Sequence, residues 1–259
     1  MKTPTLLGSL WIWAALAGCG GGGGDSASEA TYVGSNWTTY TTPSGRTVDA
    51  LLNRPVGSDV RPAVLFNHGL YVEENGYADA ADDSDGDPKC DVNDYVTALA
   101  AAGYVAVAPI RPAGLTYEDL RELVRAGIDY LKGRSDVDSA RIYLMGFSKG
   151  GFLSLQVAVE NDSDLAGLIL FSPSEGGGST PWSDWTTTPQ LQEIDVPAFL
   201  SVGELESSST RARLNAFVRD LEVLSKSIQY EIVPGADHQW FYEVHSKHWT
   251  LVIGWLAAL

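Results

Sequence analysis

The chain has 259 residues, of which 44% are hydrophobic and 10% aromatic, a composition that excludes a disordered protein and allows one domain or at most two. Its formal net charge of −16 at pH 7 argues against nucleic-acid binding, which needs a basic surface, and disfavours contact with an anionic bilayer surface. We interpret the acidity as a source of solubility outside the cytoplasm.

The N-terminal segment has the pattern of an export signal. Lys2 precedes a short apolar segment, residues 6–16, which is too short to span a bilayer as a permanent helix. The sequence "LAGC" then resembles the lipobox of bacterial lipoproteins. The resemblance implies removal of residues 1–18 and lipidation of Cys19, which would be the protein's only contact with a membrane. An ordinary secretory signal is the alternative.

The segment after Cys19 is predicted to be a tether. Residues 19–30 are rich in glycine, serine and acidic side chains, and they precede a folded domain predicted over residues 31–259. A glycine directly after Cys19 favours the outer membrane by resemblance to bacterial sorting rules, so we expect a lipid-anchored protein of the bacterial cell envelope, or an exported one. Cys90 is then the only free thiol, and its acidic neighbours would raise its pKa, so we interpret it as structural.

From Thr31 onward the apolar pattern alternates between strands and helices. A hairpin is predicted around Pro43-Ser44-Gly45. The expected strands are residues 36–42, 46–54, 63–66, 104–108, 141–145, 166–171, 198–202 and 228–233. The expected helices are residues 95–102, 117–132, 151–160, 210–225 and 249–259. This order predicts an α/β fold with a mainly parallel sheet, helices on both faces and antiparallel strands at one edge, and ligands should bind beyond the carboxyl ends of the strands.

The sequence "LMGFSKGGF" places Ser148 between glycines, where a strand is expected to end and a helix to begin. A tight strand-to-helix turn would strain the backbone of Ser148 and expose its hydroxyl above the sheet. Gly146 and Gly150 would remove the side chains that clash in such a turn, and Gly151 would let the helix pack close to the strand. The pattern predicts a nucleophilic serine.

A serine nucleophile needs a base, and the chain has four histidines. His238 lies in a loop directly after the last expected strand, at the edge where Ser148 is expected, and is our candidate for the base. His68 also follows a strand, but its setting in "NHGL" suits a role in structuring the loop. His245 and His248 flank the start of the last helix and are interpreted as surface or capping residues.

The base in turn needs a carboxylate that fixes its tautomer. Strand 198–202 ends in "GELES", so Glu204 and Glu206 are both candidates, and both give the chain order serine, acid, histidine. Glu175, at the end of the preceding strand, is a more distant candidate. For each of the three, the alternative is a solvated loop carboxylate.

Four motifs, "NHGL", "GFSKGG", "GELES" and "PGADH", together resemble the α/β-hydrolase fold, and "VDSARIYLMGFSKGG" resembles its dienelactone-hydrolase-like branch. The resemblance covers nearly all of the chain after the tether and implies an α/β-hydrolase fold with a sheet of about eight strands and no large lid. It maps the acid to Glu206, although the family more often has aspartate there.

An oxyanion hole is the next expected part of the site. The backbone N–H of Lys149, at the start of a helix, is one expected donor. The resemblance implies that the second is the N–H of Leu70, with Tyr71 as the alternative. The family usually has an uncharged residue where Lys149 stands; we interpret this side chain as solvent-facing, with a preference for acidic substrates as the alternative.

Aromatic side chains are candidates for a substrate-binding groove. These are Tyr71, Trp182, Trp185 and Trp240, and for the tryptophans the alternative is that they cover apolar surface.

The acidic segment after His68 carries a second hypothesis. Carboxylates at positions 1, 3, 5, 9 and 12 of a loop resembling an EF-hand are supplied by Asp83, Asp85, Asp87, Asp91 and Asp94. Pro88 stands where that loop needs glycine, and its last ligand is usually glutamate. A solvated acidic loop is the alternative to calcium binding.

These observations predict a monomeric serine esterase that acts on a small or polymeric carboxylic ester and needs no metal or organic cofactor. A peptidase of the prolyl-oligopeptidase-like group is one alternative, although the large extra domain usual in that group is absent. A non-catalytic surface binding protein that uses the acidic loop is the other.

Overall fold

The computed structural model describes residues 32–81, 90–161, 164–176 and 180–259. These residues form one eight-stranded sheet in the order β1-β2-β4-β3-β5-β6-β7-β8. The strands are β1 Tyr32–Thr41, β2 Thr47–Pro55, β3 Arg61–Asn67, β4 Val105–Pro109, β5 Val137–Phe147, β6 Gly167–Phe171, β7 Ala198–Gly203 and β8 Ile228–Val233. The α-helices are α1 Leu70–Asn75, α2 Tyr77–Ala80, α3 Val92–Ala101, α4 Tyr117–Lys132, α5 Lys149–Asn161, α6 Thr188–Gln192, α7 Ser208–Val223 and α8 Ser246–Ala257, and two 3₁₀ turns span Trp182–Asp184 and Gln239–Tyr242.

The strand directions confirm the predicted sheet. β1 pairs with β2 and β2 with β4 in antiparallel fashion, so the hairpin forms one edge. Every other neighbouring pair, from β4 and β3 through to β8, is parallel. The carboxyl ends of β3 to β8 therefore meet at one edge of the molecule, where the loops that carry the candidate site residues begin.

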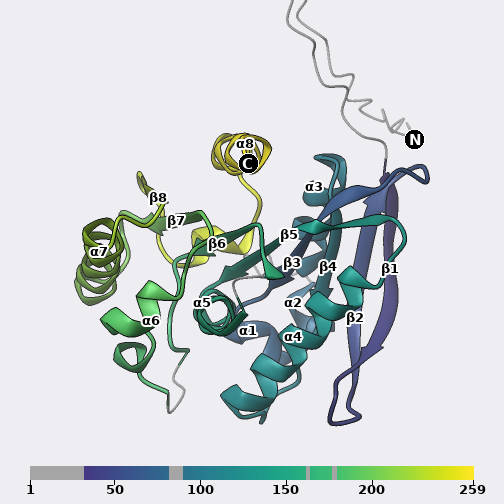
Figure 1. Cartoon of the computed structure of the whole chain (residues 1–259), viewed down its shortest axis with the longest axis horizontal. Coiled ribbons are helices and arrows are strands. Elements are labelled where there is room, and N and C mark those ends of the chain that lie inside the picture. The colour runs from purple at the N-terminus through teal and green to yellow at the C-terminus, as the bar shows by residue number, and fades with distance from the viewer. Residues whose placement is uncertain (1–31, 82–89, 162–163, 177–179) are drawn as a thin grey trace, which may run out of the picture.

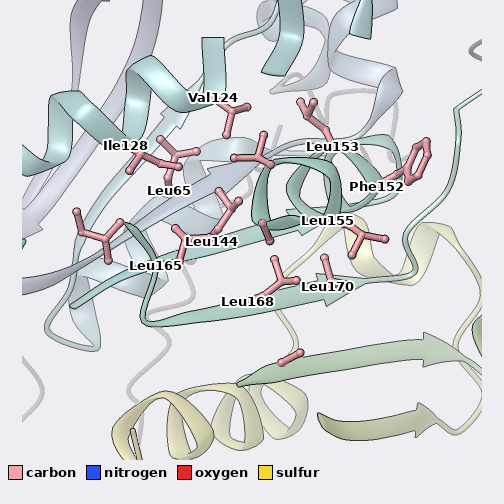
Figure 2. Close-up of a cluster of buried hydrophobic side chains, with 14 of the residues drawn as sticks. Leu65, Val124, Ile128, Leu144, Phe152, Leu153, Leu155, Leu165, Leu168 and Leu170 are labelled. Carbon is pink, nitrogen blue, oxygen red and sulfur yellow. The ribbon is translucent and has the colours of Figure 1, made fainter. Parts of the chain in front are cut away.

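Two apolar clusters cover the two faces of the sheet, because successive strand residues point to opposite faces. Leu65 belongs to the cluster that includes residues of α4, α5 and α7, whereas its neighbours Val64 and Phe66 belong to the cluster that includes residues of α3 and α8. Figure 1 shows α8 on one side of the sheet and α4 and α5 on the other. The first cluster joins Leu144 of β5 to Val124 and Ile128 of α4 (Figure 2).

Local signals explain where the helices begin. α4 has the predicted bounds because Thr116 and Asp119 form a capping box at its start. α3 begins earlier than predicted, since the Asp91 side chain accepts a hydrogen bond from the Asn93 N–H and caps the helix there. The short helices α1, α2 and α6 were not predicted from the apolar periodicity.

Within the described ranges no helix is both long and apolar enough to cross a membrane. The predicted signal segment, Cys19 and the tether all lie outside the residues that the structure describes.

Candidate active site

Ser148 occupies a tight turn between β5 and α5. Its φ is +52°, in the left-handed backbone region that residues other than glycine rarely adopt. Its N–H donates to the Phe171 carbonyl at 2.9 Å. A Cβ at Gly146 would overlap the Gly150 carbonyl, and a Cβ at Gly150 would overlap the carbonyls of Asn67 and His68. The two glycines therefore allow the turn that presents the serine, as the sequence predicted.

The structure brings His238 to Ser148. Its Nε2 lies 2.8 Å from Ser148 Oγ, and its Nδ1 lies 2.6 Å from Glu206 Oε1. A carboxylate can only accept, so Nδ1 carries the proton and Nε2 is left to accept from the serine hydroxyl. The His238 side chain is 34% exposed, whereas that of Glu206 is 6% exposed. The imidazole is therefore held from its buried side and is open to solvent on the other.

Glu206 is the carboxylate that reaches the histidine. Burial alone would raise its pKa, but the hydrogen bond and charge interaction with His238, together with a hydrogen bond from Ser172 and the charge of Arg213, hold the pKa below its usual value. A Cβ at Gly203, the last residue of β7, would overlap the Ala236 carbonyl, so glycine lets the loop that carries the histidine approach β7. The Leu205 N–H donates to the same carbonyl at 2.8 Å.

The other two acid candidates are engaged elsewhere. Glu204 accepts a hydrogen bond from the Gly235 N–H at 2.8 Å, on the exposed surface. Glu175 accepts from the Trp182 N–H and pairs with Arg213 at 3.4 Å. Neither carboxylate contacts His238, so the geometry favours Glu206.

The remaining histidines have structural partners. His68 is buried and structures its loop as expected: Nδ1 lies 2.8 Å from the Gly69 carbonyl, and Nε2 accepts from the Arg111 N–H at 3.0 Å. His245 stacks on Trp240 and lies at the N-terminus of α8. The prediction for His248 was wrong, because this side chain is buried and lies 2.7 Å from Ser201 Oγ. Burial lowers its pKa to about 4.

The two residues expected to supply the oxyanion donors each begin a helix. Lys149 is the first residue of α5, and Leu70 is the first residue of α1, directly beyond β3. Leu70 and Tyr71 line a pocket of about 250 Å³ together with Ser148 and His238. The rest of its lining is Glu74, Phe147, Gly176 and Tyr242. Three of the residues that line the pocket with Ser148, namely Tyr71, Phe147 and Tyr242, are therefore aromatic.

The interpretation of Lys149 as solvent-facing was wrong. Its side chain is buried, donates to the Glu73 carboxylate and lies over the Tyr117 ring, 5.5 Å from the centroid. Glu73 also accepts from Arg111 at 2.8 Å. The sequence analysis missed Glu73 and Arg111, although Arg111 follows the end of β4 and so lies at the strand-end edge that was searched for other residues.

The three tryptophans are not among the described residues that line the pocket. Trp182 is buried between Phe152 and Phe217, which corrects its expected place in a groove. Trp185 lies under the Arg121 guanidinium at 4.7 Å. Each covers apolar surface, the alternative considered for them. Tyr71 does line the pocket, and its hydroxyl donates to Asp79 at 2.6 Å.

Most of the residues in the calcium hypothesis lie outside the part of the chain that the structure describes. Asp83, Asp85 and Asp87 fall in the undescribed range 82–89. Of the other two, Asp91 caps α3 and Asp94 lies in its first turn. No group of three or more metal-ligating side chains is found among the described residues. Calcium binding therefore stays a prediction.

Cys90 is fully buried at the head of α3. Burial is the main cause that raises the pKa of its thiol to about 12, and the nearby Asp91 adds to it. The expected raised pKa and structural role fit this setting, but the acidic neighbours contribute less than expected.

Comparisons with solved structures show the fold. The esterase Est22 superposes with a TM-score of 0.68 at 16% identity, covering 88% of this chain and 82% of its own. A protein of Klebsiella pneumoniae subsp. pneumoniae MGH 78578, described as a candidate dienelactone hydrolase, gives 0.67 at 16% identity, covering 88% and 100%. An esterase of Rhizomucor miehei gives 0.64 at 15% identity, covering 88% and 83%. Comparison with curated proteins gives no match.

The sequence itself matches the profile of the dienelactone hydrolase family over residues 115–256. The matched region includes Ser148, Glu206 and His238, whereas Leu70 and Glu73 lie before it. Because this region is more than half of the 259 residues, the chain belongs to the dienelactone hydrolase family, and its fold is the α/β-hydrolase fold.

Proposed function

We propose that this protein is a serine hydrolase that cleaves carboxylic esters through an acyl-enzyme. The observation that carries the proposal is the unbroken series of hydrogen bonds from Ser148 to His238 to Glu206, each residue in a loop that follows a parallel strand. This arrangement supplies a nucleophile, a base and a carboxylate that orients the base.

The first half of the reaction forms the acyl-enzyme. Ser148 Oγ attacks the ester carbonyl as His238 Nε2 takes the hydroxyl proton, and Glu206 stabilises the imidazolium. The carbonyl oxygen becomes negative and accepts from the N–H groups of Lys149 and Leu70. When the tetrahedral intermediate collapses, the bond to the alcohol oxygen breaks, and His238 returns its proton to the leaving alcohol.

The second half reverses the roles with water. His238 takes a proton from the attacking water, the acyl carbon gains the hydroxyl, and the bond to Ser148 Oγ breaks. The carboxylic acid leaves and the serine regains its proton from His238. Both halves use the same base and the same oxyanion donors.

The pocket supports a small ester as substrate. Its volume of about 250 Å³ and its lining of Leu70, Tyr71, Phe147 and Tyr242 suit a short acyl chain or an aryl group. One structure of Est22 was solved with p-nitrophenol, and its TM-score to this chain is 0.64. We therefore expect aryl esters of short acids to be cleaved faster than long-chain esters.

A series of p-nitrophenyl esters, from acetate to long acyl chains, tests the proposal on wild type beside Ser148→Ala. Turnover by wild type that Ser148→Ala lacks would support it. If every ester fails while a fluorophosphonate labels Ser148, the nucleophile is active on another bond, and peptides are the next substrates to test. If neither reaction occurs, the proposed function is wrong.

The N-terminal segment extends the proposal to location. We propose that residues 1–18 are removed on export and that Cys19 is acylated, with residues 19–30 as a tether, on the resemblance of "LAGC" to a lipobox. Mass spectrometry of the mature N-terminus, compared with a Cys19→Ser variant, tests this. A mature chain that begins elsewhere and carries no lipid would contradict it.

A further inference from the structure

We propose that Glu73 and Lys149 are positioning residues whose buried ion pair holds the two halves of the oxyanion hole at a fixed separation. The inference rests on the proposed function, because it assumes that the N–H groups of Leu70 and Lys149 bind the oxyanion. It adds two residues, one of them outside the matched family region, and gives the charged side chain of Lys149 a role.

The pair joins the two helices that carry the donors. Glu73 is three residues after Leu70 on α1, and Lys149 is the first residue of α5. The Lys149 ammonium donates to Glu73 Oε2, so one side-chain contact connects α1 to α5. In the described residues no other ion pair links α1 to α5.

A third charge fixes the carboxylate. Arg111 Nε donates to Glu73 Oε1 at 2.8 Å, and the same guanidinium donates to the His68 carbonyl. The Arg111 N–H also donates to His68 Nε2 at 3.0 Å. Arg111 therefore anchors both Glu73 and the loop that leads into Leu70, so the oxyanion loop is held at two points.

Burial makes these contacts difficult to exchange for water. The side chains of Arg111, Glu73 and Lys149 are 0%, 4% and 11% exposed. A buried charge that loses its partner is strongly disfavoured, so the ammonium and the carboxylate stay together. Surface ion pairs are not constrained in this way.

Packing confines Lys149 to this direction. A Cβ at Gly176 would lie within 3.0 Å of three carbons of the Lys149 side chain, so the loop after β6 closes over it. The Tyr117 ring lies on the ammonium. Because the ammonium is committed to Glu73, the alternative that Lys149 recruits an acidic substrate loses its support, and positioning is the role that the contacts favour.

The test compares Lys149→Met with wild type and with a matched control, Lys226→Met. Lys149→Met leaves Arg111 paired with Glu73, so no unpaired charge is buried. Lys226 pairs with Asp195 at 2.5 Å and has a side chain that is 15% exposed, but neither residue is among the described residues that line the pocket. We expect kcat of Lys149→Met to fall about 10- to 100-fold with KM within about twofold of wild type. Lys226→Met should match wild type.

A second readout separates positioning from general loss of structure. A boronic acid forms a tetrahedral adduct with Ser148 and places an oxygen in the oxyanion hole, so its affinity should fall by the same factor as kcat. Labelling of Ser148 by a fluorophosphonate shows that the nucleophile is still competent. Lys149→Arg, which keeps the charge and the donor, should recover part of the loss.

A folded Lys149→Met with wild-type kcat and boronate affinity would overturn the inference, as would a loss confined to KM. If that variant fails to fold, Lys149→Leu carries the test: it also removes the ammonium and leaves Glu73 paired with Arg111, and the same selective loss of kcat and boronate affinity is expected. Failure of the proposed function is distinct, since wild type itself would then neither turn over esters nor be labelled at Ser148.

Discussion

The part of the chain that the structure describes contains two hydrogen-bonded serine–histidine pairs, and only one of them has the surroundings of an active site. Ser148 Oγ lies 2.8 Å from His238, and Ser201 Oγ lies 2.7 Å from His248. His238 is also hydrogen-bonded to the Glu206 carboxylate and faces a pocket. His248 is surrounded by the rings of Phe171, Phe199, Trp240 and Phe241.

The difference shows that a hydrogen bond between serine and histidine does not make a nucleophile. Among the described residues no carboxylate hydrogen-bonds to His248, so nothing stabilises its imidazolium, and burial lowers its pKa to about 4. Ser201 lies within β7, whereas Ser148 follows β5 in a left-handed turn. Access, a carboxylate and a strained turn distinguish the pair that can react.

The largest effect should come from removing each serine in turn. Ser148→Ala should lower kcat by about 10⁴-fold or more, because no other group can form the acyl-enzyme. Ser201→Ala should keep activity within about threefold of wild type, since its partner has no route to substrate. Ester hydrolysis and fluorophosphonate labelling measure both. Loss of labelling in Ser201→Ala but not in Ser148→Ala would reverse the assignment.

Glu206→Gln should have the next largest effect. The amide keeps the size of the side chain but can donate to Nδ1, which favours the wrong tautomer of His238, so kcat should fall about 10²- to 10⁴-fold. Glu204→Gln is the matched control, because Glu204 bonds only to the Gly235 N–H on the surface. Kinetics of both variants decide between the two acids; a larger loss in Glu204→Gln would contradict the geometry.

The strained turn can be broken without touching the triad. Gly150→Ala would force its Cβ against the carbonyls of Asn67 and His68, so we expect a loss of about 2–3 kcal/mol in the free energy of unfolding, with loss of activity. Gly254→Ala is the control, because Gly254 is an exposed residue of α8 and a Cβ added there would have no atom within 4 Å. This change should stabilise the protein by about 0.5–1 kcal/mol, since alanine favours a helix more than glycine does. Denaturant unfolding measures both, and equal effects would refute the tight turn.

The pH dependence of stability reports on the second serine–histidine pair. The unfolded His248 binds a proton near its ordinary pKa of 6.5, while the folded one resists until about 4. Stability therefore falls as the pH falls from 6.5 to 4, with His248 contributing at most about 3 kcal/mol. His248→Gln should flatten this part of the curve. His68, whose pKa burial also lowers, is common to both proteins, so the difference in slope reports His248 alone. If the free energy of unfolding of wild type and of His248→Gln depended on pH with the same slope, His248 would make no such contribution.

Local sequence predicted the strands and the longer helices, because each signal lies within a few residues. The choice of Glu206 over Glu204 came from the family resemblance instead. The capping box of α4 and the glycines around Ser148 are visible in the sequence, and His238 and Glu206 follow strands. Parallel strands bring their carboxyl ends together, so strand-end residues could be grouped without coordinates.

Contacts between distant segments were beyond that reasoning. Lys149 and Glu73 are 76 positions apart, and Ser201 and His248 are 47 apart. A lysine beside a nucleophile and a histidine near a helix start give no sequence signal of burial. Trp182 illustrates the same limit, since only the folded structure shows that Phe152 of α5 and Phe217 of α7 cover it.

Because Cys90 is fully buried, the rate at which its thiol is modified reports how often this part of the structure opens. Cys90 precedes α3 and is fully buried, so in a Cys19→Ser chain, which retains one cysteine, a thiol reagent modifies this sulfur only when the structure around it opens transiently. When reclosing is fast, the modification rate divided by that of a free thiol gives the fraction of time for which this corner is open. A ligand that binds the pocket and favours the closed form would lower the modification rate of Cys90, while the reaction of the same reagent with a free thiol would be unchanged.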